Sequence, residues 1–272
     1  MVFDFNNYVS DRYIGEGYSG CVYLYRNKYD DNDVIVGKNS STLEIDAMMA
    51  SRCKHVVKCL GTQTLDECTR IVFMEYCNRG DVFDMFARQS HSVAEKIMSL
   101  DEVWCCNLEI FQQLCEGVKH MHACGVVHYD IKPENVFITK DLVVKLGDFG
   151  LATTKGRRCS NVIGTVGCMA PEVLGKRSHG VEADVWSMGV MLYQLLHFGM
   201  LPFGKPETEE ALLAQRAHMW IRIDVSIRFP AVGDLLVRML NVDPSKRITM
   251  DAVAKAVSGI VKAAAVAVDV DV

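Results

Sequence analysis

The hydrophobic periodicity of this 272-residue chain changes near residue 80, and this change limits the folds that it can adopt. Before that point, short apolar runs alternate with turns rich in Gly, Asp and Asn, a pattern typical of β-strands. A short helix is expected between the third and fourth strands, with Ser41 or Thr42 as its N-cap and its end near Cys53. The predicted strands lie at Tyr8–Val9, Val22–Leu24, Val34–Val36, Val56–Leu60 and Ile71–Met74.

Beyond residue 80 the apolar residues recur at helical spacing. Residues 104–122 and 232–239 predict amphipathic helices, and residues 183–199 are apolar almost all round, which indicates a buried helix. The sequence therefore predicts an α+β chain of two lobes with a hinge near residues 75–80. The predicted limits are a small β-rich N-lobe with one main helix at about 1–76, a larger, mainly helical C-lobe at about 77–260, and a tail at 261–272.

The composition argues against several classes of protein. A net charge of −5 disfavours a general nucleic-acid binder, which needs a basic face. The apolar runs are shorter than a membrane span, so we expect no membrane insertion. The start of the chain lacks the features of a secretory signal and the cysteines are odd in number, so we expect reduced thiols and a cytoplasmic protein, with the nucleus as the alternative. The oligomeric state has no signal in the sequence.

Three glycines, Gly15, Gly17 and Gly20, occur in the spacing GxGxxGxV. Glycines let a turn between strands approach phosphate oxygens and offer backbone N–H groups to them. A dinucleotide-binding loop has a similar spacing but opens a helix, whereas here the chain continues from Val22 as a strand. The three glycines are therefore candidate phosphate ligands, although an ordinary glycine-rich hairpin has the same pattern.

Lys38 ends the third predicted strand, one hairpin after the glycines. A lysine in this position is often only an edge residue, but beside a glycine-rich turn it is a candidate phosphate ligand. Its flexible side chain needs an acidic partner to fix its position. Glu44, which has apolar neighbours at helical spacing, is the predicted partner, and Asp46 is the alternative.

The sequence HYDIKPEN is followed, within one short segment, by DFG. Phosphoryl transfer requires neutralisation of the phosphate charge and a carboxylate that orients the attacking hydroxyl. Hard oxygen ligands suit Mg²⁺, so Asn135 and Asp148 are the predicted metal ligands. Asp130 is then available to accept the hydroxyl proton, and Lys132 to face the transferred phosphate.

Together these motifs resemble the eukaryotic protein kinase family, and the resemblance extends over roughly residues 8–260. It implies a bilobal kinase fold that uses ATP and Mg²⁺, in which Lys38 pairs with Glu44 and Asp130 is the catalytic base. It also implies an ion pair between Glu172 and Arg247. It further implies that Asp184 holds the catalytic loop. The nucleotide-binding residues that it implies are Met74 as gatekeeper, Glu75 and Cys77 at the hinge, Asp81 near the ribose, and Val22, Val36 and Phe137 around adenine.

Lys132 and the pair Gly164-Thr165 resemble the serine/threonine members of the family, which implies a protein substrate with a Ser or Thr acceptor. Tyr129 stands where the family usually has arginine. An arginine there is a buried cation that a phosphate on the activation loop, Asp148–Glu172, commonly neutralises, whereas tyrosine is uncharged at neutral pH. We therefore expect the protein to be substantially active without that phosphate.

The basic residues Lys155, Arg157 and Arg158 offer the opposite possibility, a phosphate pocket of their own. Two other departures from the family are a linker of only five residues between Lys38 and Glu44, and Cys168 in place of an aromatic residue.

Two alternatives to a protein kinase stay open in the sequence. A kinase-like scaffold without catalysis would usually have lost the lysine or one of the two aspartates, and all three are present here. A small-molecule kinase on the same fold is the other alternative, which the motif around Glu172 disfavours.

Overall fold

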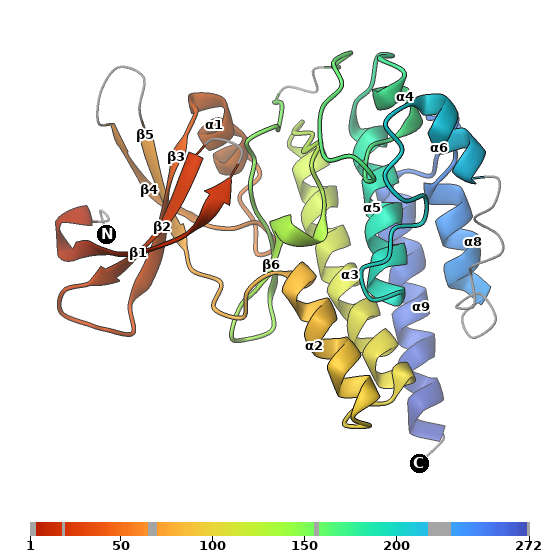
Figure 1. Cartoon of the computed structure of the whole chain (residues 1–272), viewed down its shortest axis with the longest axis horizontal. Helices are drawn as coiled ribbons and strands as arrows, with labels where there is room; N and C mark the ends of the chain where they lie inside the picture. The colour runs from red at the N-terminus through yellow and green to blue at the C-terminus, as the bar shows by residue number, and fades with distance from the viewer. Residues whose placement is uncertain (1–3, 18–19, 65–69, 155–157, 217–229, 271–272) are drawn as a thin grey trace.

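The computed structural model describes residues 4–17, 20–64, 70–154, 158–216 and 230–270. A β-sheet forms one end of the molecule and a bundle of helices forms the other (Figure 1). The two-lobed α+β architecture predicted from the sequence is confirmed.

The sheet is antiparallel with the strand order β1-β2-β3-β5-β4. Its register sets Val22 opposite Lys38, and Val36 opposite Met74. Because side chains two residues apart on a strand share a face, Val36 and Lys38 point to the same side of the sheet. A short 3-10 helix, Phe5–Asn7, precedes the sheet. The strands are β1 Tyr8–Gly17, β2 Gly20–Asn27, β3 Val34–Ser40, β4 Cys59–Thr64 and β5 Arg70–Glu75.

Helix α1 spans Thr42–Ala50 and is capped by Ser41, whose hydroxyl accepts the N–H of Glu44 at 3.1 Å. The predicted cap is therefore confirmed, but the helix ends before Cys53, where the sequence pattern placed its end. The hydroxyl of Ser51, just after the helix, bonds to the carbonyl of Ala47, which turns the chain out of the helix.

The strand predicted at Val56–Leu60 is wrong at its start, because β4 begins at Cys59. Val56 and Val57 are buried against β7, Val144–Leu146, of the helical lobe. The Val57 N–H donates to the carbonyl of Leu146 at 2.9 Å. This apolar segment thus packs between the lobes, and its hydrophobicity alone did not distinguish that position from a strand.

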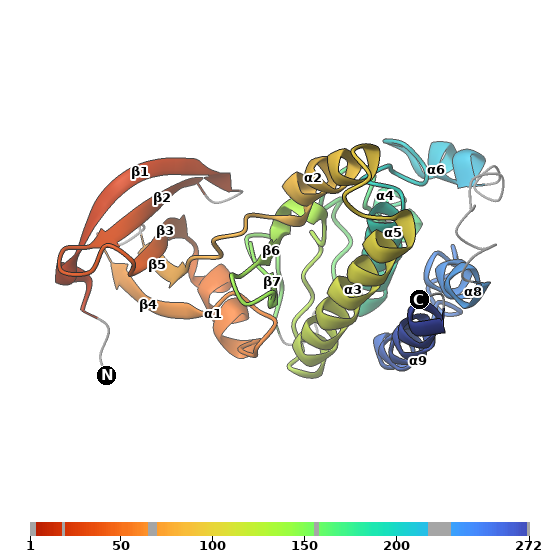
Figure 2. The same cartoon turned by 90° about the horizontal axis from the view of Figure 1, so that it is seen from below.

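The helical lobe is built around α5, whose residues from Ala183 to Leu196 are all buried. The predicted buried helix is therefore confirmed. Helix α3 packs along α9 and against α5 (Figure 2). The elements of this lobe are α2 Val82–Ala94, α3 Leu100–Ala123, a 3-10 turn Pro133–Asn135, β6 Val136–Ile138, β7, α4 Pro171–Leu174, α5 Val181–Leu196, α6 Glu209–Arg216, α8 Pro230–Met239 and α9 Met250–Val270.

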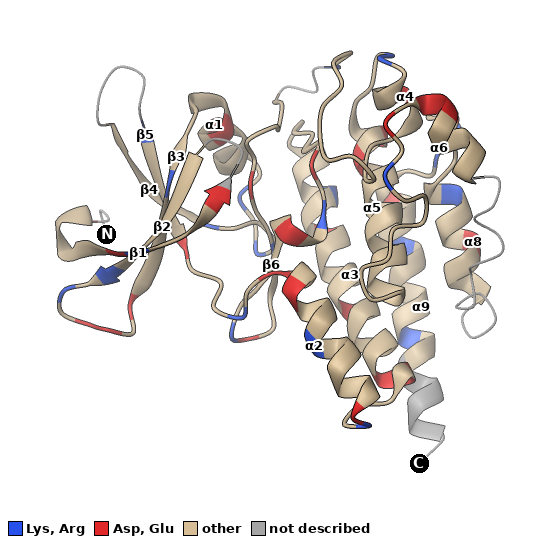
Figure 3. Ribbon diagram, in the orientation of Figure 1, with Lys and Arg blue, Asp and Glu red and all other residues tan. Residues whose placement is uncertain are grey.

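The predicted boundary at residue 260 lies inside α9, and Ala264 beyond it is buried. Acidic residues lie at the beginnings of α2 and α6 (Figure 3), where they interact favourably with the helix dipole. Within the described ranges, no helix combines the length and apolar character needed to cross a bilayer.

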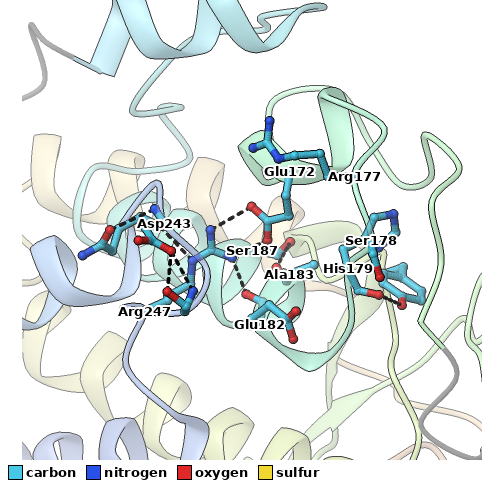
Figure 4. Close-up of polar contacts among 12 residues, drawn as sticks. Glu172, Arg177, Ser178, His179, Glu182, Ala183, Ser187, Asp243 and Arg247 are labelled. Atoms are coloured by element: carbon cyan, nitrogen blue, oxygen red, sulfur yellow. Dashed lines mark hydrogen bonds and ion pairs between the residues drawn. The ribbon is translucent and has the colours of Figure 1, made fainter.

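A buried ion pair joins α4 to the turn before α9 (Figure 4). The guanidinium of Arg247 bonds both carboxylate oxygens of Glu172, at 2.6 and 2.9 Å, and both side chains are inaccessible to solvent. Further donors of Arg247 reach the carbonyls of Asn241 and Glu182, and its guanidinium stacks on Trp186. Each charge is thereby neutralised and hydrogen-bonded, which a buried ion pair requires.

We expect Arg247→Met to lower the free energy of unfolding by about 3–5 kcal/mol, because it leaves the Glu172 carboxylate buried without a partner. Urea denaturation measures the loss. Lys246→Met is the matched control, since the neighbouring Lys246 is exposed and pairs with Asp243 only at 3.4 Å, and it should shift stability by less than about 0.5 kcal/mol. Equal effects of the two substitutions would contradict the prediction.

Candidate active site

A cleft of about 760 Å³ lies between the two lobes. It has the size and the mixed polar and apolar lining of a small-molecule site. The sequence-predicted residues that line it are Gly15, Val22, Val36, Lys38, Glu44, Met74, Glu75, Cys77, Asp81, Asp130, Lys132, Asn135, Phe137 and Asp148.

Gly17 and Gly20 pair with each other where β1 and β2 meet. The glycine-rich turn therefore joins two strands and does not open a helix, as the sequence indicated. The lining also contains Ile14, Val57 and Leu151, which sequence reasoning missed. Ile14 and Leu151 directly adjoin predicted motifs, which was an available signal, whereas Val57 was hidden by its wrong assignment to a strand.

Lys38 lies at the centre of a buried charge cluster. Its Nζ is 2.7 Å from Glu44 Oε1 and 2.5 Å from Asp148 Oδ1. Burial disfavours the charge on Lys38, but Asp148 and Glu44 more than offset this effect and raise its pKa. The predicted pairing with Glu44 is present, while Asp46, the alternative partner, is exposed on the other side of α1. The short linker is accommodated because α1 begins directly after β3.

Asp148 has a backbone φ of +54°, which places it in the left-handed region that non-glycine residues rarely occupy. Burial would raise its pKa, but the nearby ammonium of Lys38 outweighs burial and lowers it. The carboxylate therefore stays ionised at neutral pH. Such local strain, held by the surrounding structure, occurs mostly at functional sites.

A second cluster surrounds the carboxylate of Asp130. Thr165 donates its hydroxyl proton to Asp130 Oδ1 at 2.6 Å, and the ammonium of Lys132 lies 3.0 Å from Oδ2. Lys132 also donates to the Thr165 hydroxyl at 2.8 Å. The side-chain amide of Asn135 donates to Oδ2 at 3.1 Å and to the Asp130 carbonyl at 2.8 Å. The carboxylate is thereby held in one orientation, facing the cleft.

The loop that carries Asp130 is anchored by Asp184 of α5, which is fully buried. The carboxylate of Asp184 accepts the backbone N–H groups of His128 and Tyr129, at 2.9 and 2.8 Å. His122 of α3 contacts the same carboxylate at 2.8 Å. The predicted holding contact is present, and it fixes the backbone just before Asp130.

His128 links the loop that carries Asp130 to the segment that carries Asp148. Its Nδ1 accepts the N–H of Asp130 at 3.2 Å, so its Nε2 carries the proton and donates to the carbonyl of Gly147 at 3.1 Å. This carbonyl immediately precedes Asp148. One neutral imidazole therefore connects the two candidate catalytic aspartates.

At the inner end of the cleft, Glu75 joins the lobes. Its Oε1 lies 2.7 Å from the ammonium of Lys145 on β7 and accepts the N–H of Lys58 at 2.7 Å. Burial raises the pKa of the neighbouring Cys77 thiol to about 12, so this thiol is neutral. Asp81 caps α2 by accepting the N–H of Asp84. Its pKa is raised, mainly by burial and also by the nearby carboxylates of Asp84 and Glu134.

The residues predicted to bind a divalent cation have suitable donors. Asp148 contributes an ionised carboxylate, and it is the Oδ1 atom of this carboxylate that forms the ion pair with Lys38. The nitrogen of the Asn135 amide is directed to Asp130, which leaves its oxygen as the atom for a cation. Two hard oxygen donors on the wall of one cleft fit Mg²⁺, which keeps water and substrate oxygens as its other ligands.

Comparisons with known proteins agree with this geometry. A family model for the protein kinase domain matches residues 8–257. The serine/threonine-protein kinase PEPKR2 of Arabidopsis thaliana is 33% identical over 260 residues, which cover 91% of this chain and 52% of that protein. The serine/threonine-protein kinase PLK1 of Xenopus laevis is 31% identical over 220 residues, 79% of this chain and 34% of that protein. The chain thus spans about half or less of these relatives.

We expect Asp184→Asn to increase hydrogen exchange at the amides of His128 and Tyr129 by at least about tenfold. The amide group of asparagine has one acceptor oxygen, so it cannot accept all three of the present contacts, and a bond to a charged acceptor contributes about 1.5–3 kcal/mol. Exchange measured by mass spectrometry on peptides covering the loop tests this. Asp251→Asn, at the exposed start of α9, is the control; unchanged exchange in Asp184→Asn would refute the anchoring role.

Proposed function

The chain belongs to the protein kinase family, and from this premise we propose that it transfers the γ-phosphate of ATP to serine or threonine hydroxyls of protein substrates. One observation carries the proposal. The Lys38–Glu44–Asp148 cluster and the Asp130 cluster line the same cleft. Transfer of a phosphoryl group needs both, one to hold the donor and one to orient the acceptor.

Asp130 is the proposed base. As the substrate oxygen forms its bond to the γ-phosphorus, the hydroxyl proton passes to the Asp130 carboxylate and the bond from phosphorus to the leaving ADP oxygen breaks. Thr165, Lys132 and Asn135 hold this carboxylate toward the cleft. Its orientation before substrate arrives reduces the entropy lost on the way to the transition state.

Lys132 is proposed to neutralise charge on the transferred phosphate, and Lys38 to hold the phosphates that remain with ADP. Lys38 is suited to this because Glu44 fixes its position without removing its charge. Mg²⁺, which Asn135 and Asp148 are proposed to bind, supplies further neutralisation of phosphate charge when it is present.

The preference for serine and threonine is supported by the contact of Lys132 with Thr165, the two residues on which the sequence resemblance rests. It is also supported by the two relatives compared above, which are described as serine/threonine kinases. Val22, Val36 and Phe137 are proposed to enclose adenine, with Met74, Glu75 and Cys77 along its edge and Asp81 near the ribose.

We expect Asp130→Asn to lower kcat by about 10²–10⁴-fold, because an amide cannot accept the hydroxyl proton. The KM for ATP should change little, since Asp130 orients the acceptor and not the nucleotide. The measurement uses labelled ATP with a peptide chosen from a randomised library by the wild-type protein. Near-normal turnover of the variant would show that another residue is the base, and no transfer by the wild type to any library peptide would refute the proposed function.

We expect Lys38→Met to abolish transfer and Glu44→Gln to reduce kcat/KM for ATP by about tenfold or more, because the ion pair sets the position of the ammonium. Asp46→Asn is the matched control two residues away on the exposed face of α1, and it should retain wild-type kinetics. A loss in Asp46→Asn equal to that in Glu44→Gln would contradict the assignment of Glu44.

A further inference from the structure

Tyr129 contacts Gly164 of the activation loop through its backbone, and the chain just before α5 through its side chain. Its carbonyl oxygen lies so close to Gly164 that a Cβ atom at residue 164 would be 2.5 Å away. Gly164 has a φ of +109°, so both its conformation and this approach require glycine. The Tyr129 hydroxyl donates to the carbonyl of His179 at 3.2 Å. Tyr129 therefore packs against the residue before Thr165 and, separately, forms a hydrogen bond to the chain that leads into α5.

His179 continues this connection into the activation loop. Its N–H donates to the carbonyl of Cys159 at 2.9 Å and its carbonyl accepts the N–H of Cys159 at 3.0 Å. Its ring Nε2 lies 3.0 Å from the carbonyl of Asn161, which can only accept, so Nε2 carries a proton. The imidazole is fully buried and lies edge-to-face with Tyr129, with ring centroids 5.1 Å apart at an interplanar angle of 83°.

These contacts hold a short stretch of the activation loop, residues 159–165, at both of its ends. His179 fixes Cys159 and Asn161, the Tyr129 carbonyl contacts Gly164, and the next residue, Thr165, bonds to Asp130. The stretch also supplies Ile163 to the wall of the cleft. A loss of the Tyr129–His179 contact would release the residues that bring Thr165 to the proposed base.

We infer that Tyr129 and His179 are positioning residues for phosphoryl transfer, and that together they hold residues 159–165 in the conformation that presents Thr165 to Asp130. This inference rests on the proposed kinase function. Neither residue touches the reacting groups. Their effect on the reaction passes through the backbone of the loop and through Thr165.

The Tyr129–His179 contact needs no charged partner. Burial, and then the Asp184 carboxylate, raise the pKa of the Tyr129 hydroxyl further above neutrality, so it remains a hydrogen-bond donor. Because the contact joins uncharged groups, a phosphate is not required on the loop to balance a buried cation at position 129.

Arg158, the one residue of the basic trio within the described ranges, is already engaged. Its guanidinium donates to the hydroxyl and the carbonyl of Ser178 at 2.8 and 2.9 Å, and it forms an ion pair with Glu182. Figure 4 shows Ser178 and His179 in the chain just before α5, and Glu182 at the start of that helix. Lys155 and Arg157 lie outside the described residues. Arg158 thus ties the loop, one residue before Cys159, to Ser178 and to the carboxylate of Glu182.

The test uses full-length protein treated with phosphatase, with removal of phosphate verified by mass spectrometry. We expect the treated wild type and Ser160→Ala to keep activity within about tenfold, because the loop is held by its own side chains. His179→Ala should raise the KM for the peptide or lower kcat by about tenfold or more, while the KM for ATP stays within about twofold. Tyr129→Phe, which removes only one hydroxyl, should lose about threefold to tenfold.

Two further variants distinguish positioning from general damage to the fold. His179→Gln retains an amide donor for the Asn161 carbonyl and should recover activity to within about threefold of the wild type. Tyr193→Phe alters another buried tyrosine in the same lobe, which stacks on His197, and it should leave both KM values unchanged.

Hydrogen exchange of residues 158–168 provides a readout that does not depend on activity. His179→Ala should accelerate this exchange by about tenfold or more, and Tyr193→Phe should not. Equal increases in the KM for ATP and for peptide, unchanged exchange, or activity lost on phosphatase treatment would each overturn the inference. Absence of any transfer by the wild type would refute the kinase proposal instead, and the exchange measurement would still decide whether the pair holds the loop.

Discussion

The geometry of the cleft between the lobes depends on the hydrogen bonds of one fully buried carboxylate, that of Asp184. A carboxylate without partners in a protein interior is strongly destabilising. This one is satisfied by two backbone N–H groups of the loop that carries Asp130 and by His122. The loop therefore cannot move away without exposing this charge to an apolar interior. Since α5 is buried from Ala183 to Leu196, the loop is tied to the interior of the helical lobe.

The same principle of satisfied buried charge organises the contact between the lobes. Lys38 comes from the sheet, Glu44 from α1 and Asp148 from the segment after β7, and each loses solvent when the cleft forms. Their mutual attraction offsets that loss only while all three elements stay in register. Glu75 and Lys145 add a second connection at the inner end of the cleft. The arrangement of the lobes is thus coupled to the placement of the proposed phosphate-binding groups.

The activation loop is held differently from these charged clusters. Its described residues are fastened by Tyr129, by His179 and by backbone pairs, with one partly exposed ion pair at Arg158. Neutral hydrogen bonds between buried groups are little affected by salt or by added charge. The described part of the loop is therefore held mainly by uncharged groups of the chain itself.

The sequence by itself determined the two-lobed α+β fold, the buried helix α5 and most of the residues that line the cleft, because periodicity and motif spacing are local properties that the chain retains in any context. It did not distinguish Val56 and Val57 from a strand, since burial between lobes and burial in a sheet select the same apolar residues. It also did not reveal the contact of Tyr129 with His179, two residues fifty positions apart. Only the tertiary structure decided that contact, because it depends on where the buried Asp184 places the loop that carries Asp130 relative to the chain entering α5.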